Sequence, residues 1–174
     1  MTPISFTGTV EVLGIRHLLR LPQEASLALA SRGQVAATVT VDGSQATTVV
    51  EPDGRRGHWL NLDALGIDSS WEPGTEVSVD LEPTKTWPEV TIPDDLRSAL
   101  DAAPDLEETW VSLTPMARWE WVRWVQATRS EATRAKRVGV SVDKLRHGKR
   151  RPCCFDLSSC TDPEVARSAK LPEA

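Results

Sequence analysis

The feature that most constrains the fold is a series of turn-forming residues that cuts the first 84 residues into short segments. Asp42-Gly43, Pro52-Asp53-Gly54 and Glu72-Pro73-Gly74 stand between stretches rich in β-branched and alternating apolar residues. The Asp-Gly pair favours a tight hairpin because glycine accepts the positive φ that the turn needs. The pattern therefore predicts strands at residues 4–13, 15–21, 34–41, 45–51, 58–62 and 76–81.

Six short strands in so compact a span favour a small β-barrel. One stretch does not fit the strand pattern. Residues 22–30 combine helix formers with a proline at the start, and Gly33 follows as a stop. We expect a single short helix here that closes one end of the barrel.

The second half of the chain reads as helical after an extended connector at residues 83–93, where two X-Pro steps disfavour helix. A helix is predicted at 94–102, capped by Asp94. Another is predicted to begin near Ser112 or Thr114, with Thr114 as the cap and Pro115 in the first helical position. Further helices are predicted at 130–137, ended by Gly139, and at 142–146, capped by Ser141 and stopped by Gly148. The apolar stripe of the helix that follows Thr114 consists of Ala117, Trp121, Trp124, Val125 and Thr128.

These elements predict an α+β protein in which a β-barrel with one short helix precedes a small all-helical domain. The expected divisions are a barrel domain at 1–84, a connector with a short helix at 85–111, a basic Trp-rich helical domain at 112–150 and a Cys-containing tail at 151–174.

The net charge of −5 conceals a change of sign along the chain. Residues 1–111 carry 7 Lys or Arg against 18 Asp or Glu, whereas residues 112–152 carry 11 against 3. Such asymmetry indicates either an anionic partner for the basic segment or a basic helix pair that lies against an acidic domain of the same molecule.

Targeting features are absent from the pattern. No run of eighteen apolar residues occurs, and the N-terminal residues lack the basic start and apolar core of a secretion signal. The three cysteines fall within eight residues near the C-terminus, unlike a disulfide framework. We therefore expect a cytoplasmic protein, as a monomer or a homodimer.

The cysteines and a nearby histidine form the first candidate site, a soft ligand set that suits zinc or copper(I). Its spacing lacks the usual two-residue gap between thiolates, so a reversible disulfide and an inert tail stay open as alternatives. The candidate metal ligands are His147, Cys153, Cys154 and Cys160.

Basic residues form the second candidate site, since they could hold phosphate groups by charge and bidentate contacts. The alternative is a solvated helix face with local ion pairs, which the acidic character of the whole molecule favours. The candidate anion-binding residues are Arg123, Arg134, Arg137, Lys149, Arg150 and Arg151.

Aromatic residues form the third candidate site, a groove between the barrel and the helical domain for an apolar or flat ligand. The alternative is that the rings merely seal an interface between domains. The candidate groove residues are Trp87, Trp110, Trp119, His58 and Trp59.

Four segments in the second half of the chain stand in a characteristic order and spacing: Leu113-Thr114-Pro115, residues 121–125, residues 131–137 and Gly148-Lys149-Arg150. In both respects they resemble the YdeI/OmpD-associated family. The upstream residues, including Leu21-Pro22, Gly57-His58-Trp59-Leu60 and the segment 73–79, are similar to a small barrel domain of unknown function that often precedes this family's domain. The resemblance implies a double-split β-barrel, as in AbrB/MazE-like transcription regulators, joined to a compact helical domain. It also implies links to envelope stress and bacteriocin tolerance, and it brings no established catalytic residues.

Three functions remain open from the sequence. The first is a non-enzymatic stress or resistance accessory protein that binds a small apolar molecule or peptide between the barrel and the helical domain. The second is a metal or redox sensor that uses the cysteines, and the third is a nucleic-acid-binding regulator that uses the basic helices. No nucleophile, metallohydrolase or phosphate-loop pattern is present, which disfavours an enzyme.

Overall fold

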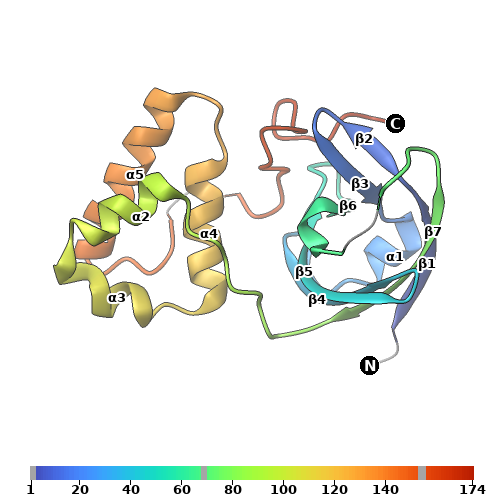
Figure 1. Cartoon of the computed structure of the whole chain (residues 1–174), viewed down its shortest axis with the longest axis horizontal. Coiled ribbons are helices and arrows are strands. Elements are labelled where there is room, and N and C mark those ends of the chain that lie inside the picture. The colour runs from blue at the N-terminus through green and yellow to red at the C-terminus, as the bar shows by residue number, and fades with distance from the viewer. Residues whose placement is uncertain (1–2, 68–69, 153–155) are drawn as a thin grey trace. The chain divides into compact units, whose positions relative to one another are not determined.

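The computed structural model describes residues 3–67, 70–152 and 156–174. The chain divides into two compact units. The barrel unit comprises Met1–Pro88, Asp156–Cys160 and Glu164–Ala174, and the helical unit comprises Glu89–Phe155 and Thr161–Pro163. The C-terminal segment thus returns to the barrel unit after the chain has formed the helices (Figure 1).

The barrel unit is a curled half-barrel of seven antiparallel strands in the order β1-β7-β4-β5-β6-β3-β2 (Figure 1). The α+β organisation predicted from the sequence, a barrel followed by helices, is confirmed. The first predicted strand is split at Val10, whose backbone bonds to Gly74 and Thr75 instead of continuing the ladder. The strands are β1 (Ile4–Thr9), β2 (Glu11–Leu13), β3 (Arg16–Arg20), β4 (Val35–Val41), β5 (Ser44–Pro52), β6 (His58–Asn61) and β7 (Glu76–Pro83).

The predicted hairpin at Asp42-Gly43 is present between β4 and β5, where Val41 pairs with Ser44. Asp42 and Gly43 both have positive φ, 45° and 85°. Two successive left-handed residues make the hairpin turn whose twist matches that of the strands, and the residue pair suited to it is the one in the sequence.

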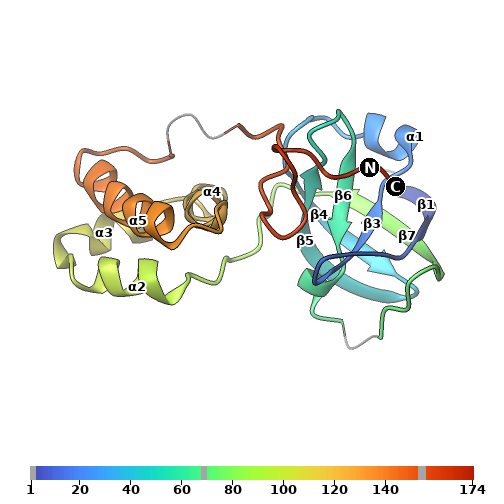
Figure 2. The ribbon, with the colours of Figure 1, turned by 90° about the horizontal axis from the view of Figure 1, so that it is seen from above.

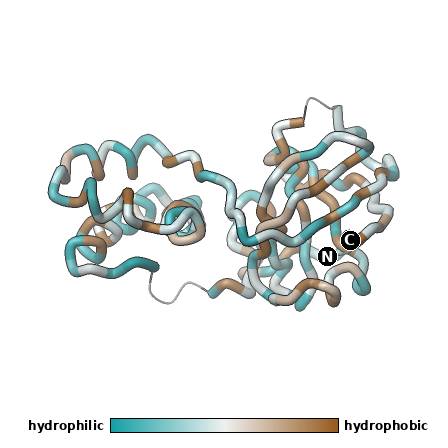
Figure 3. Tube along the Cα trace, turned by 90° about the horizontal axis from the view of Figure 1, so that it is seen from below, coloured by the Kyte–Doolittle hydropathy of each residue, from teal (hydrophilic) through white to brown (hydrophobic). Residues whose placement is uncertain are grey.

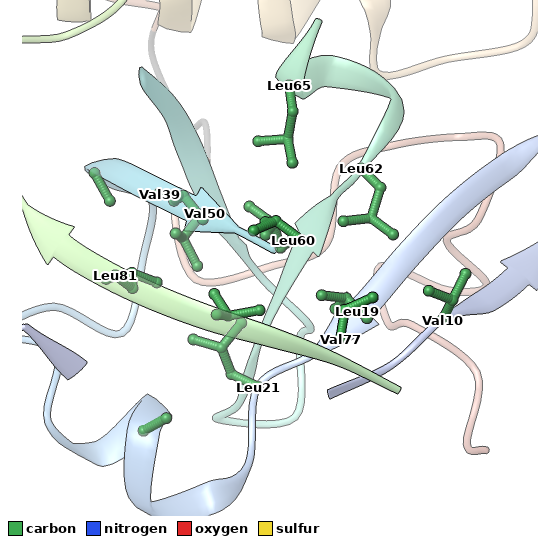
Figure 4. Close-up of a cluster of buried hydrophobic side chains, with 14 of the residues drawn as sticks. Val10, Leu19, Leu21, Val39, Val50, Leu60, Leu62, Leu65, Val77 and Leu81 are labelled. Carbon is green, nitrogen blue, oxygen red and sulfur yellow. The ribbon is translucent and has the colours of Figure 1, made fainter. Parts of the chain in front are cut away.

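Apolar side chains at alternating positions along the strands form the core of the half-barrel. Val39, Leu60, Val77 and Leu81 are at most 3% exposed, and Figure 4 shows the side chains of this cluster filling the space that the strands enclose. Burying each such side chain stabilises the fold by about 1.5–3 kcal/mol. The predicted short helix is α1 (Gln23–Leu27), which adds Ala25 to the same cluster.

The C-terminal segment forms a second, smaller core on the barrel unit. Leu18 and Trp59 are fully buried under Cys160, Val165 and Leu171. The Leu171 amide donates to the Asp53 carbonyl at 2.8 Å, and the Cys160 amide donates to Ala169 at 3.0 Å. Figure 2 shows this segment, coloured red, running beside the strands. Residues 156–160 and 164–174 are therefore integral to the barrel unit.

The helical unit contains α2 (Asp94–Asp101), η2 (Pro104–Leu106), α3 (Glu107–Val111), α4 (Pro115–Gln126) and α5 (Glu131–Arg146). Hydrophobic and hydrophilic residues alternate along these helices in Figure 3. The buried members of their shared core are Leu96, Ala103, Leu106, Trp110, Leu113, Ala117, Trp121, Val122, Val125, Val138 and Leu145. The segment predicted at 85–111 as a connector with one short helix thus holds α2, η2 and α3, which pack within this unit.

Two helix starts show how local sequence works here. The Thr114 hydroxyl accepts the Ala117 amide at 3.2 Å, and Pro115 is the first helical residue, as predicted. The cap predicted at Asp94 is wrong. Pro93 takes that position, and Asp94 is the first residue of α2 with no side-chain capping bond.

The break predicted at Gly139 is also wrong, because α5 runs through it from Glu131 to Arg146. Val138 and Leu145, on either side of the glycine, are buried and hold the helix together by packing. Ser141 begins no new helix, since its hydroxyl donates to the Arg137 carbonyl one turn back at 2.8 Å. The predicted stop at Gly148 is confirmed by its φ of 74° and by the bond from Lys149 to Lys144.

Within the described ranges, none of the helices has the length and apolar character that a bilayer crossing requires.

Candidate functional site

A groove of about 300 Å³ lies on the helical unit where the chain reverses between α2 and α3. Ligand pockets in proteins begin at about this size. Most of its lining is apolar, with a few charged groups. The lining residues are Ile92, Arg97, Leu100, Asp101, Pro104, Leu106, Glu107, Trp110 and Val111.

The reversal at Ala103 creates the groove. Ala103 is buried and accepts the Leu106 amide at 2.9 Å, while its own amide donates to Leu100 at 2.9 Å. Pro104 starts η2, a position where the missing amide proton costs nothing. The turn therefore sets Leu100 of α2 and Trp110 of α3 into the lining of one groove.

The floor and rim of the groove differ in exposure. Leu106 and Trp110 are 2% and 9% exposed, whereas Val111 is 69% exposed. Val111 therefore presents apolar surface at the rim, and a ligand in the groove could cover it. The charged lining residues, Arg97, Asp101 and Glu107, are exposed.

Arginines from α4 and α5 brace the acidic segment that carries the groove. Arg134 bonds to both oxygens of Asp95, at 2.5 and 3.0 Å, and Arg146 bonds to both oxygens of Asp105, at 2.7 and 3.1 Å. Each arginine lowers the pKa of its partner carboxyl, chiefly through these hydrogen bonds. A third arginine, Arg118, binds Glu89 at 2.8 Å and also donates to the Leu113 carbonyl.

The candidate anion-binding residues are distributed among such internal contacts. Arg134 and Arg151 bind Asp95 and Glu120, and Arg150 donates to Ser112. Arg123 lies over the Trp119 ring at 5.8 Å. Arg137 lies over the Trp124 ring at 5.5 Å and donates to the backbone carbonyl of Trp124. The side chain of Lys149 has no partner among the residues described. The carboxylates that pair with Arg134, Arg146 and Arg151 belong to the helical unit itself and not to the acidic strand-rich domain.

The candidate aromatic residues lie in different places. Trp110 is the one that lines the groove. Trp87 and Trp119 are half-buried, in the barrel unit and on α4 respectively. His58 and Trp59 are 1% and 0% exposed, and the groups around them belong to their own barrel unit.

His58 pairs with a serine in a way that would suit nucleophilic chemistry if it were accessible. Its Nε2 lies 3.1 Å from the Gly33 carbonyl, which only accepts, so Nδ1 is the acceptor of the 2.7 Å bond from the Ser26 hydroxyl. Ser26 is 2% exposed, and no substrate can reach it. Burial lowers the pKa of His58, which keeps the ring neutral and explains the pair as a satisfied structural bond.

The candidate metal ligands are only partly visible. Cys153 and Cys154 lie outside the described residues. Cys160 is 2% exposed in the small core with Trp59, and His147 is exposed at the end of α5 with its Nδ1 2.8 Å from the Asp143 carbonyl. Across the described ranges, no three His, Cys, Asp or Glu residues gather as a metal site requires.

Comparison with known families follows the division into two units. Residues 89–148 match the family model of bacteriocin-protection, YdeI or OmpD-associated proteins, and residues 6–81 match a domain of unknown function, DUF1905. The helical unit thus contains a region similar to YdeI/OmpD-associated proteins, and the barrel unit contains a region similar to DUF1905, as the resemblance predicted. No curated protein matches it.

All lining residues of the groove fall within the YdeI/OmpD-associated match. Sequence reasoning missed most of them because it placed no helix between Pro104 and Ser112. The signal was present in Leu106 and Trp110, two apolar residues spaced by four in a stretch that is otherwise acidic.

Proposed function

We propose that the protein is a non-enzymatic accessory protein of stress or resistance that binds a small apolar molecule in the groove between α2 and α3. The observation that carries the proposal is this groove of about 300 Å³, with an apolar floor at Leu106 and Trp110 and an exposed Val111 on its rim. That volume suits one compact molecule or a single apolar side chain of a peptide. The word bacteriocin-protection in the family description supports a role in resistance.

A cytoplasmic location is part of the proposal. It is supported by the clustering of all three cysteines within eight residues near the C-terminus, which is unlike the disulfide framework of a secreted domain.

The test is a titration of the full-length protein with naphthalenemethanol, a neutral bicyclic probe, followed by calorimetry and by the indole signal of Trp110 in two-dimensional NMR. Val111→Asp places a charge on the apolar rim without disturbing a buried position, so it should weaken binding about tenfold or more. Leu27→Asp is the matched control, because Leu27 is similarly exposed at 63% but belongs to α1 of the barrel unit. Absence of probe binding, or equal affinity in the two variants, would refute the groove as the binding site.

A further inference from the structure

We infer that the groove between α2 and α3 selects apolar molecules that carry a positive charge. This inference rests on the proposed function and adds the chemical class of the ligand. Its basis is the distribution of ion pairs around the groove.

Carboxylates near the groove fall into two groups. Glu89, Asp95 and Asp105 are each bound by an arginine of α4 or α5, as described above. Asp101 and Glu107, which line the groove, form no ion pair with any residue in the described part of the chain, and both are exposed. The bracing arginines therefore leave the two lining carboxylates uncompensated.

Only one cation, Arg97, lines the groove against these two carboxylates. Arg97 makes no ion pair of its own within the described ranges, so the lining carries two negative charges and one positive charge. A ligand amine could approach Asp101 and Glu107 while its apolar body covers Leu100, Trp110 and Val111. Attraction between charges at such a partly exposed site is modest but sufficient for discrimination between ligands of equal shape.

The experiment compares three probes with one naphthalene body: naphthylmethylamine, the neutral naphthalenemethanol and the anionic naphthoate. The amine should bind the full-length protein about fivefold more tightly than the alcohol, since an exposed ion pair contributes up to about 1 kcal/mol. Naphthoate should bind more weakly than the alcohol. Added salt should reduce the preference, because exposed charges are screened over about 8 Å at physiological ionic strength.

Two matched double variants test which carboxylates cause the preference for the amine. In the double variant Asp101→Asn with Glu107→Gln, the amine should bind no more tightly than the alcohol when both are measured on that variant. Asp94→Asn with Glu108→Gln removes the same charge from exposed positions of α2 and α3 outside the lining, and it should keep the preference.

The outcomes separate the two proposals. If the alcohol binds and the amine binds no better, the charge selection is refuted while the apolar site stands. Tighter binding of naphthoate, or an equal loss of preference in both double variants, would also overturn the selection. Binding of none of the probes would refute the proposed function together with this inference.

Discussion

His58 shows how one residue can be accounted for by its surroundings. The ring lies in β6, donates to Gly33 and accepts from Ser26, so every polar atom of the imidazole is satisfied inside the barrel unit. The pKa of His58 is lowered mainly by burial and also by the charge of Arg32, while the Gly33 carbonyl and Asp53 act in the opposite direction. The neutral form is thus part of the folded state.

The pH dependence of stability should report this buried ring. Because the folded pKa lies below the ordinary value of 6.5, the unfolded chain takes up the proton first as the pH falls. The contribution of His58 to the free energy of unfolding is complete above pH 6.5. As the pH falls from 6.5 to the folded pKa, that contribution declines by up to about 1.4 kcal/mol per pH unit. Urea unfolding from about pH 8 to about pH 5, followed on the strand signals by NMR, measures the slope.

His58→Gln supplies a neutral donor and acceptor that cannot titrate, so it should flatten that slope. His17→Gln is the control, because His17 is about one-third exposed and bonds to the exposed Asp63. The explanation fails if the slope is unchanged in His58→Gln or is lost equally in His17→Gln.

Helix α5 is continuous although it contains Gly139, a residue type that disfavours helix. Gly139 is exposed, and a Cβ built on it meets no atom within 4 Å. Its cost to the helix is therefore backbone entropy alone, and the packing of Val138 and Leu145 outweighs that cost.

Gly139→Ala should raise the free energy of unfolding by about 0.5–1 kcal/mol, because alanine keeps the helix without a new contact. Gly74→Ala is the matched control, since the space around Gly74 is equally open but its φ of 86° is unfavourable to any side chain. That variant should lose about 1 kcal/mol or more. Thermal and urea unfolding of both variants measure the changes, and destabilisation by Gly139→Ala would show that the glycine has a role beyond this backbone cost.

At the scale of the whole molecule, the barrel unit is assembled from both ends of the chain. The helical unit lies within the sequence between β7 and the C-terminal segment, and Leu18 and Trp59 are covered by residues that follow the helices. A chain cut after the DUF1905 match would leave both side chains exposed to water.

Deletion of residues 164–174 should therefore destabilise the barrel and leave the helices folded. In two-dimensional NMR, signals of α4 and α5 should keep their positions, whereas those of β3 and β6 should shift or broaden. The single substitution Leu171→Ala should cost about 2–5 kcal/mol, since Leu171 is fully buried. Leu27→Ala, at a position that is 63% exposed, should change stability by less than about 0.5 kcal/mol. Unchanged barrel signals in the deletion variant would contradict an integral C-terminal segment.

The sequence by itself determined the features whose causes lie within a few residues. Asp42-Gly43 set the β4–β5 turn and Gly148 ended α5 through a positive φ. Thr114-Pro115 started α4 through a capping hydroxyl and a proline that lacks an amide proton. Each of these effects acts on the adjacent backbone. Strand positions followed for the same reason, since side chains alternate with period two whatever the strand pairs with.

Only the tertiary structure decided the features that depend on distant residues. Arg134 finds Asp95 at a separation of 39 residues, and Arg146 finds Asp105 at a separation of 41, so no local pattern could distinguish a braced carboxylate from one left to face the groove. The continuity of α5 through Gly139, the formation of α3 and the burial of Leu18 under the C-terminal segment have the same origin. Packing and ion pairing act across space, and their free energies exceed the local preferences that oppose them.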